Sequence, residues 1–245
     1  MTHLYLIRHG EALTNVDGSV AGTQGDKGLT DHGREQARRL RDRLAATGEI
    51  QADVLIASTL ERARQTAEII APALGLPIIA DDDVQEMRVG EADGMSHDEF
   101  IATHGKPDFR RSPFKPLSPG GENWPHFVVR VATALDRIVR EHHGKTIVIV
   151  CHGGVIDASF SIFFGLGSLA LPQSEFHTRN TSITHWELRE REGEPPRWRL
   201  DRYNDDVHTH DIGADERIQW TRLAATYHAS PWSDEPSVPL PTEES

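Results

Sequence analysis

The stretch LYLIRHGEALTN, residues 4–15, changes from apolar to polar and charged residues after Ile7. Leu4–Ile7 is a short apolar run of the kind found in a strand that is buried on both faces. A cation, an imidazole, a glycine and an acid follow directly as Arg8, His9, Gly10 and Glu11. Many strands end in polar turns, so this cluster alone does not establish a functional site. The rest of the chain has to decide between a turn and a site.

Apolar runs of this kind recur along the chain and alternate with stretches of helical periodicity. Strands are expected over residues 4–7, 54–57, 78–80, 146–151, 182–188 and 198–203. Helices are expected over residues 31–48, 59–75, 123–144 and 155–165, with a short one opening at 96–100. This alternation predicts an α/β fold: a three-layer α/β/α sandwich with a mainly parallel central sheet and a small lid insertion.

The helix expected over 31–48 has a clear start, an apolar side and a charged side. Thr30 can cap its N-terminus, and Gly48 follows its end. Its inner stripe is expected to consist of Ala37, Leu40, Leu44 and Ala45. Its solvent-facing side is expected to consist of Arg38, Arg39, Arg41 and Arg43.

The length of 245 residues is enough for one sizeable core. We expect a single domain over residues 1–229. Within it, residues of about 105–125 are rich in Pro and Gly, which is typical of a lid or binding loop. Residues 230–245 are acidic and rich in Pro, and we expect a disordered tail there.

The composition narrows the class of protein. A formal net charge of -12 argues against a general nucleic-acid binder, which needs a basic face. The sequence has no apolar stretch long enough to span a bilayer and no signal peptide, so we expect no membrane partner and a cytoplasmic location. The single cysteine, Cys151, argues against internal disulfides and most thiolate metal sites. Whether the chain forms a homodimer stays open.

Polar or small residues follow three of the expected strands. They are the Arg8-His9-Gly10 group, Ser58 with the helix start after it, and the His152-Gly153-Gly154 group. The carboxyl ends of parallel strands lie at one edge of a sheet, where ligands bind in this fold class. Because the net charge would repel an anion, local arginines and histidines would have to attract it.

Two further candidates join this edge. Arg62 lies in the first turn of the helix after Ser58, and Glu86 lies in QEMRVGEADG. Singly, each candidate has an ordinary structural explanation, such as capping a strand end or pairing with a neighbouring charge. Two arginines, two histidines and one carboxylate at one edge are harder to explain in this way and indicate a site.

An ordered set of motifs strengthens this interpretation. It consists of LIRHGEALTN, GDKGLTDHGREQA, ASTLERARQTA, VQEMRVGEADG, PGGEN, IVIVCHGGVI, NTSITHWEL and YNDDVH. Together these motifs resemble the histidine phosphatase superfamily, the phosphoglycerate mutase-like proteins, over about residues 4–210, in the order found in that family.

The resemblance implies a role for each matching residue of the reaction centre. His9 would be the nucleophile that forms a phosphohistidine, and a neutral imidazole is able to attack phosphorus. Arg8, Arg62 and His152 would hold the phosphoryl oxygens. Glu86 would give a proton to the leaving alkoxide and later take one from water. The resemblance implies no metal and no other cofactor.

The resemblance also indicates residues around this centre. Asn15 would contact the phosphate, and so would the backbone N–H after His152, at Gly153. Arg110 and Arg111 lie in the expected lid, where mutases of the superfamily have an arginine pair, and substrate contact is expected from them.

Within the superfamily, the sequence favours hydrolysis over mutase chemistry. True mutases have a longer insert after the glutamate, whereas here a compact lid separates Glu86 from the helix over 123–144. Ala12 also stands where mutases usually have serine. We therefore expect a phosphatase acting on a small phosphorylated metabolite. The alternatives are a 2,3-bisphosphoglycerate-dependent phosphoglycerate mutase and a non-catalytic member that binds phosphorylated ligands.

Overall fold

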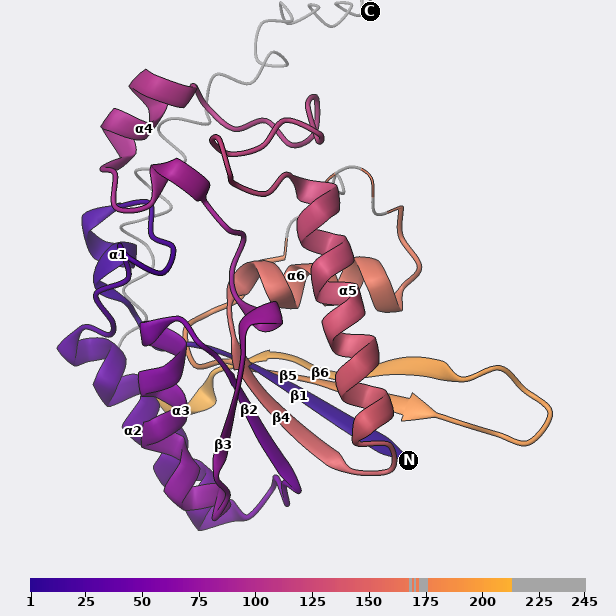
Figure 1. Cartoon of the computed structure of the whole chain (residues 1–245). Coiled ribbons are helices and arrows are strands. Elements are labelled where there is room, and N and C mark those ends of the chain that lie inside the picture. The colour runs from indigo at the N-terminus through magenta and orange to yellow at the C-terminus, as the bar shows by residue number, and fades with distance from the viewer. Residues whose placement is uncertain (168, 170, 172–175, 213–245) are drawn as a thin grey trace, which may run out of the picture. The chain divides into compact units, whose positions relative to one another are not determined.

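The central feature of the fold is a six-stranded sheet (Figure 1). The computed structural model describes residues 1–167, 169, 171 and 176–212, and these residues belong to one compact unit. The strands are β1 (Thr2–Arg8), β2 (Val54–Ser58), β3 (Ile78–Asp81), β4 (Thr146–Cys151), β5 (Ile183–Arg189) and β6 (Arg197–Asp205). Their order in the sheet is β3-β2-β4-β1-β5-β6.

The sheet is mainly parallel, as the alternation of strands and helices predicts. β4 pairs in parallel with both β1 and β2, and β2 pairs in parallel with β3. β5 runs antiparallel to β1, and β6 runs antiparallel to β5. The carboxyl ends of β1, β2 and β4 therefore lie at one edge of the sheet, where the sequence predicts a site.

Helices cover the sheet on both faces (Figure 1). The α-helices are α1 (Leu13–Asp17), α2 (Asp31–Thr47), α3 (Glu61–Leu74), α4 (His97–His104), α5 (Trp124–Glu141) and α6 (Gly153–Phe163). The short 3-10 helices are η1 (Asp82–Val84), η2 (Gly90–Ala92) and η3 (Val207–Thr209). The helices predicted from the sequence are thus all present as α2, α3, α4, α5 and α6, and α1 is an additional short one. Among the described residues, no helix has both the length and the hydropathy needed to cross a bilayer.

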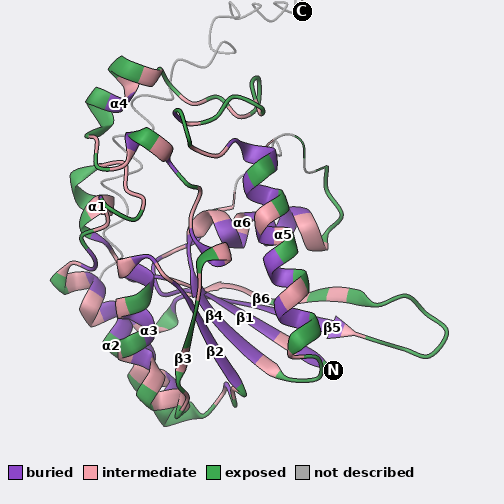
Figure 2. Ribbon diagram, viewed as in Figure 1, coloured by how far each residue is buried: buried purple, intermediate pink, exposed green. Residues whose placement is uncertain are grey.

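The two faces of the sheet form two cores, because successive side chains of a strand point to opposite sides. Leu4 and Leu6 of β1 pack in the core that α5 and α6 cover. Tyr5 and Ile7 pack in the core that α2 and α3 cover. Figure 2 shows the buried strands between the partly buried helices. This arrangement confirms the three-layer sandwich.

Helix α2 begins and ends as predicted, but two expectations about its sides are wrong. Thr30 caps it through the Gly33 amide, whereas Ala45 is exposed and adds nothing to the inner stripe. Arg43 does not face solvent freely: its guanidinium pairs with Glu49 at 2.6 Å and with Asp205 of β6 at 2.7 Å. The helical period alone could not show that β6 supplies a carboxylate there.

The expected lid lies between α4 and α5, where the chain is irregular. The predicted boundary of the domain at residue 229 and the predicted tail over 230–245 lie outside the described residues.

Candidate active site

His9 follows β1 directly, and its hydrogen bonds define its tautomer. Its Nδ1 lies 2.7 Å from the Gly10 carbonyl oxygen, which can only accept, so Nδ1 bears the proton. Its Nε2 accepts a hydrogen bond from Arg62 Nε at 3.2 Å. The lone pair of the imidazole is therefore on Nε2, on the side of the Arg62 guanidinium.

Glycines allow the chain to turn tightly after His9. A Cβ on Gly10 would lie 2.4 Å from the Gly33 carbonyl oxygen of α2, and one on Gly33 would lie 2.0 Å from the Glu11 carbonyl oxygen. The start of α2 thus packs directly on the backbone after β1. The Gly10 amide is also held, because it donates to Thr66 Oγ1 of α3 at 3.0 Å.

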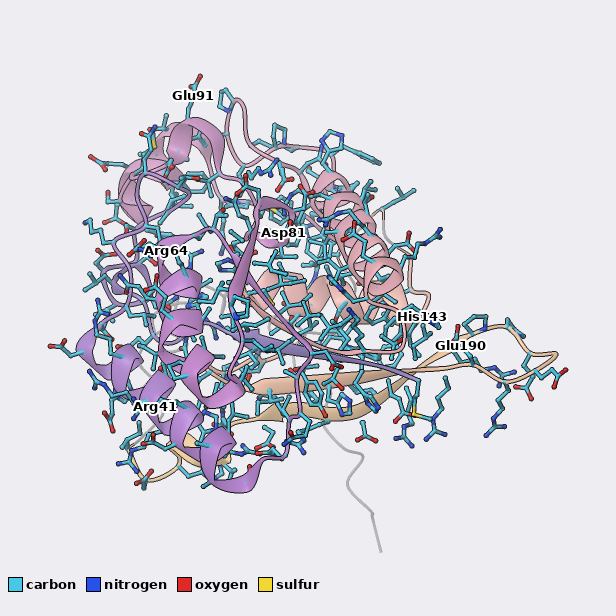
Figure 3. All side chains as sticks on the ribbon, turned by 60° about the horizontal axis from the view of Figure 1, so that its bottom comes forward. Arg41, Arg64, Asp81, Glu91, His143 and Glu190 are labelled. Atoms are coloured by element: carbon cyan, nitrogen blue, oxygen red, sulfur yellow. The ribbon has the colours of Figure 1, made fainter. Side chains whose placement is uncertain are left out.

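Arg62 lies in the first turn of α3, as predicted, and a buried carboxylate fixes it. Its Nη1 pairs with Asp26 Oδ2 at 2.9 Å, and its backbone amide donates to the same oxygen at 3.2 Å. Both side chains are almost fully buried. Arg64, two residues further along α3, lies on the outer side of the helix instead (Figure 3) and pairs with Glu61 and Glu68. Arg62 and Arg64 therefore lie on different sides of the same helix, one buried and the other exposed.

His152 follows β4 and is fully buried. Its Nε2 lies 2.7 Å from Ser58 Oγ, and that oxygen already accepts from the Leu60 amide. Because a hydroxyl oxygen has a second lone pair, this contact fits either tautomer of the ring; in the tautomer in which the Ser58 hydroxyl donates to Nε2, the ring proton is on Nδ1. Within the described residues this buried Nδ1 has no hydrogen-bond partner, so in that tautomer it can donate to a ligand.

Arg8 and Gly153 lie side by side at the same edge. A Cβ on Gly153, the first residue of α6, would lie 3.8 Å from Arg8 Nε. Arg8 also donates from Nη1 to the Thr178 carbonyl oxygen. The start of α6, at Gly153, thus lies beside a guanidinium, an arrangement that favours anions.

Burial and positive charge keep both histidines neutral. Burial, followed by the charges of Arg62 and Arg8, lowers the pKa of His9 well below its usual range. Burial, followed by the charges of Arg62, His9 and Arg8, does the same to the pKa of His152. The two rings lie 5.1 Å apart between centroids. A neutral imidazole, whose Nε2 lone pair accepts from Arg62, thus lies among cationic donors, and this combination is suited to attack on a phosphoryl group that takes over the Arg62 hydrogen bond.

Glu86 follows η1 and reaches the start of α6. Its Oε2 accepts from the Gly154 amide at 3.0 Å, and its Oε1 accepts from the Met87 amide at 2.9 Å. A Cβ on Gly154 would lie 2.2 Å from Oε1, so a side chain there would displace the carboxylate. The structure therefore brings Glu86 to the same helix start that follows His152.

A comparison of the sequence with protein families shows which family it matches. Residues 4–206 match the model of the histidine phosphatase superfamily, branch 1. The chain belongs to this superfamily. The resemblance of the motifs is thereby confirmed for the family and its fold.

The similar proteins of this superfamily include relatives named for mutase chemistry. The chain is 32% identical over 194 residues to a probable phosphoglycerate mutase GpmB of Enterobacter sp. (strain 638), which covers 78% of this chain and 86% of the relative. It is 34% identical over 163 residues to phosphoglycerate mutase-like protein 4 of Arabidopsis thaliana, covering 62% and 67%.

Solved structures of similar fold include phosphatases. The mycobacterial glucosyl-3-phosphoglycerate phosphatase with VO3 is 26% identical, with a TM-score of 0.67, covering 82% of this chain and 98% of that one. The α-ribazole phosphatase of Shigella flexneri is 25% identical, with a TM-score of 0.69, covering 83% and 96%. Both kinds of name thus occur among proteins similar to this superfamily member.

Asn15 lies at the third position of α1. Its side-chain oxygen accepts from the Ala12 amide at 2.9 Å. Because that oxygen is engaged, the amide NH2 is the group that could donate to a phosphoryl oxygen.

The lid arginines differ from the buried cluster in their exposure. Both Arg110 and Arg111 are exposed, and the Arg111 side chain is 80% exposed with Asp108 at 3.9 Å. The structure thus brings His9, Arg62, His152, Arg8, Gly153 and Glu86 to one edge of the sheet, whereas both arginines of the lid pair are exposed.

A pocket of about 240 Å³ opens beside Glu86. Its lining includes Leu60 at the start of α3, Thr23 of the loop before α2, and Arg88 and Gly90 after the glutamate. Asp93 holds the loop, because its carboxylate accepts from the amides of residues 22, 24 and 25. The pocket is small for a ligand site, which limits what can sit next to Glu86.

Sequence reasoning missed the residues that support the site. Asp26 fixes Arg62, and Thr66 fixes Gly10. Gly154 was expected at this edge, but the room that it leaves for Glu86 was not. Ser58 was expected at this edge, but its bond to His152 was not. Asp26 stands inside the family-like motif GDKGLT, which is the signal that could have found it.

Proposed function

We propose that this protein is a phosphomonoesterase that hydrolyses a small phosphorylated metabolite through a phosphohistidine. The supporting observation is the buried, neutral His9 with its Nε2 lone pair beside Arg62. In the first step, Nε2 attacks phosphorus, the bond from phosphorus to the alcohol oxygen breaks, and Glu86 gives its proton to that oxygen. The alcohol then leaves the site.

In the second step, water attacks the phosphorus of the phosphohistidine. The Glu86 carboxylate takes a proton from this water, the N–P bond breaks, and His9 and inorganic phosphate are released. Arg8, Arg62 and the Nδ1–H of His152 hold the phosphoryl oxygens, where charge is spread in the transition state. Asn15 and the Gly153 amide add donors to the same group. The sheet edge and two helix starts hold these groups close to one another, and the Arg62 Nε–H passes from His9 Nε2 to a phosphoryl oxygen when Nε2 attacks.

The pocket beside Glu86 accommodates the alcohol part of the substrate, and its volume of about 240 Å³ supports a small metabolite. Two features of the sequence support hydrolysis: the segment between Glu86 and α5 is compact, and Ala12 stands where mutases usually have serine. The names of the structurally similar phosphatases support it as well. The proposed location is the cytoplasm, where such metabolites occur.

The second candidate function is phosphoglycerate mutase, which the names of several relatives favour. A mutase would have to return the phosphoryl group from His9 to the substrate before water reaches it. The lid offers little support for this function, because its arginines and Phe114 are exposed.

The test measures phosphate release from a panel of phosphorylated metabolites, and isomerisation of 3-phosphoglycerate primed with 2,3-bisphosphoglycerate. We expect phosphate release and an acid-labile phosphoenzyme that is absent from His9→Ala. Isomerisation without loss of phosphate to water would support the mutase instead. Ligand binding without release of phosphate from any substrate would support the non-catalytic alternative.

A further inference from the structure

Arg130 of α5 uses its whole hydrogen-bonding capacity next to the segment that bears Glu86. A guanidinium has five N–H donors, and the structure gives Arg130 five hydrogen bonds. Three go to backbone carbonyl oxygens just before or at the glutamate: Asp83 at 2.9 Å, Gln85 at 3.1 Å and Glu86 itself at 3.1 Å. The side chain is only 9% exposed. This arginine therefore holds the backbone of residues 83–86, on the N-terminal side of Glu86, against α5.

Glu122 accepts the two remaining hydrogen bonds of Arg130 and holds the backbone at Arg88, on the C-terminal side of Glu86. Its two oxygens accept from Nε and Nη2 of Arg130, both at 2.7 Å. Its carboxylate also accepts from the Arg88 amide at 2.9 Å, and its own amide donates to the Arg88 carbonyl oxygen at 2.8 Å. The Arg130–Glu122 pair thus binds backbone groups on both sides of Glu86.

The position of the Glu86 carboxylate depends on this backbone. The hydrogen bonds that it makes within the described residues come from two main-chain amides, those of Met87 and Gly154. Phe127, over which Arg130 lies at 5.2 Å from the ring centroid, also closes the space at Gly154. A shift of the segment would therefore move the carboxylate away from the start of α6.

We propose that Arg130, oriented by Glu122, is a positioning residue that holds Glu86 where it can protonate the leaving group. This inference rests on the proposed function, in which Glu86 is the general acid. Proton transfer requires hydrogen-bond reach to the leaving oxygen, so a small displacement is enough to reduce it. Buried ion pairs add little net stability, whereas their hydrogen bonds are geometrically specific.

Lysine cannot replace this arginine, although it keeps the charge. Its ammonium has three donors on a flexible stem instead of five in a planar fork. Arg130→Lys therefore separates the geometry from the charge. Arg137→Lys is the matched control, because Arg137 lies two turns further along α5 and pairs with Asp81 at 2.6 Å, upstream of the glutamate.

The experiment compares two substrates, glycerol phosphate with a poor leaving group and 4-nitrophenyl phosphate with a good one. We expect Arg130→Lys to lower kcat for glycerol phosphate about tenfold and to change kcat for 4-nitrophenyl phosphate less than about twofold. Arg137→Lys should change neither kcat more than about twofold. Circular dichroism and thermal unfolding check that each variant is folded.

The decisive measurement repeats Arg130→Lys in a Glu86→Gln background. If the arginine acts through Glu86, the tenfold loss on glycerol phosphate disappears there, because the two changes remove the same contribution. An undiminished loss in that background, or an equal loss on both substrates, would overturn the inference. If Arg130→Lys does not fold, Glu122→Gln replaces it with the same expected results. If the wild type does not hydrolyse glycerol phosphate, an alkyl phosphate of the panel that it does hydrolyse takes its place; hydrolysis of no member of the panel would instead overturn the proposed function.

Discussion

The phosphate side of the site and the lid are built in opposite ways. His9, Arg62 and His152 are buried and come from the ends of parallel strands or the start of a helix. Arg110 and Arg111 are exposed on an irregular segment. The buried group makes hydrogen bonds to buried partners, whereas the Arg111 guanidinium lies 3.9 Å from the Asp108 carboxylate on the surface. Regular elements thus fix the groups that would act on phosphorus, whereas the arginines of the expected lid lie exposed on an irregular segment.

The largest expected effect lies on the buried side. His9→Ala should lower phosphatase turnover more than about a hundredfold, because it removes the nucleophile and not a contact. Folding should change little, since the imidazole ends a strand and adds little to the core. Steady-state assays and thermal unfolding measure the two effects. Residual activity above about a hundredth of the wild type would show that His9 is not the covalent catalyst.

A second effect should follow from the partner of Arg62. Asp26→Asn leaves a buried guanidinium without its carboxylate, and breaking a buried pair destabilises a protein by about 3–5 kcal/mol. Urea unfolding should detect this loss, and kcat/KM should fall for every phosphomonoester alike. Arg64→Ala is the control on the same helix, because its ion pairs are exposed (Figure 3) and are worth at most about 1 kcal/mol. Equal losses in both variants would contradict a special role for Asp26.

A third effect concerns pH and the buried histidines. Burial and nearby arginines lower the pKa values of His9 and His152, and burial and Arg43 lower that of His208 to about 4. The unfolded chain therefore binds more protons than the folded one below pH 6.5. The free energy of unfolding should fall as the pH drops from about 6.5 to 5, by up to about 1.4 kcal/mol per pH unit for each such histidine.

Unfolding by urea at pH 7, 6 and 5 measures this slope. His208→Gln should reduce this slope, because it removes one of the histidines whose pKa is lowered. His208 Nε2 lies 3.0 Å from Thr181 Oγ1, and the Thr181 amide donates to the His9 carbonyl oxygen. A stability that rises toward pH 5, or a slope unchanged in His208→Gln, would contradict the argument.

The difference between the two sides also explains what the sequence could predict. Arg8, His9, Arg62 and His152 follow or begin regular elements, so the alternation of strands and helices places them at one edge. Their supporting partners come from distant parts of the chain: Asp26 is 36 residues from Arg62, and Ser58 is 94 residues from His152. No local pattern reports such pairings. The same limit explains Arg43, whose partner Asp205 is 162 residues away.

The fold class and the family could thus be predicted from the sequence, whereas the roles of the site residues stay predictions. The lid shows the clearest limit, because an irregular segment has no period from which to infer where its side chains lie. Its Pro and Gly content predicts an irregular segment, which the structure has between α4 and α5, but the exposed position of Arg110 and Arg111 could not be predicted.

The smallest expected effect lies on the lid. Replacing Arg110 and Arg111 together by Ala should raise KM for a substrate with a second anionic group by up to about fivefold, because exposed charge pairs are worth at most about 1 kcal/mol. It should leave KM for a neutral aryl phosphate and both kcat values almost unchanged, since binding to a remote group affects KM more than turnover. Saturation curves for both substrates measure the difference.

The matched control removes the same two charges elsewhere. Arg38 and Arg41 of α2 pair with Glu35 and Asp42 on the surface, and Arg41 is labelled in Figure 3. Replacing both by Ala makes the net charge more negative by the same amount as the lid variant. If the lid arginines act locally, only their removal raises KM for the dianionic substrate. If both double variants raise it equally, the cause is the overall charge of -12 becoming more negative, and the lid pair has no contact with substrate. If the lid variant weakens both substrates alike, the arginines act on the transferred phosphate, and the division between a buried phosphate side and a substrate-reading lid fails.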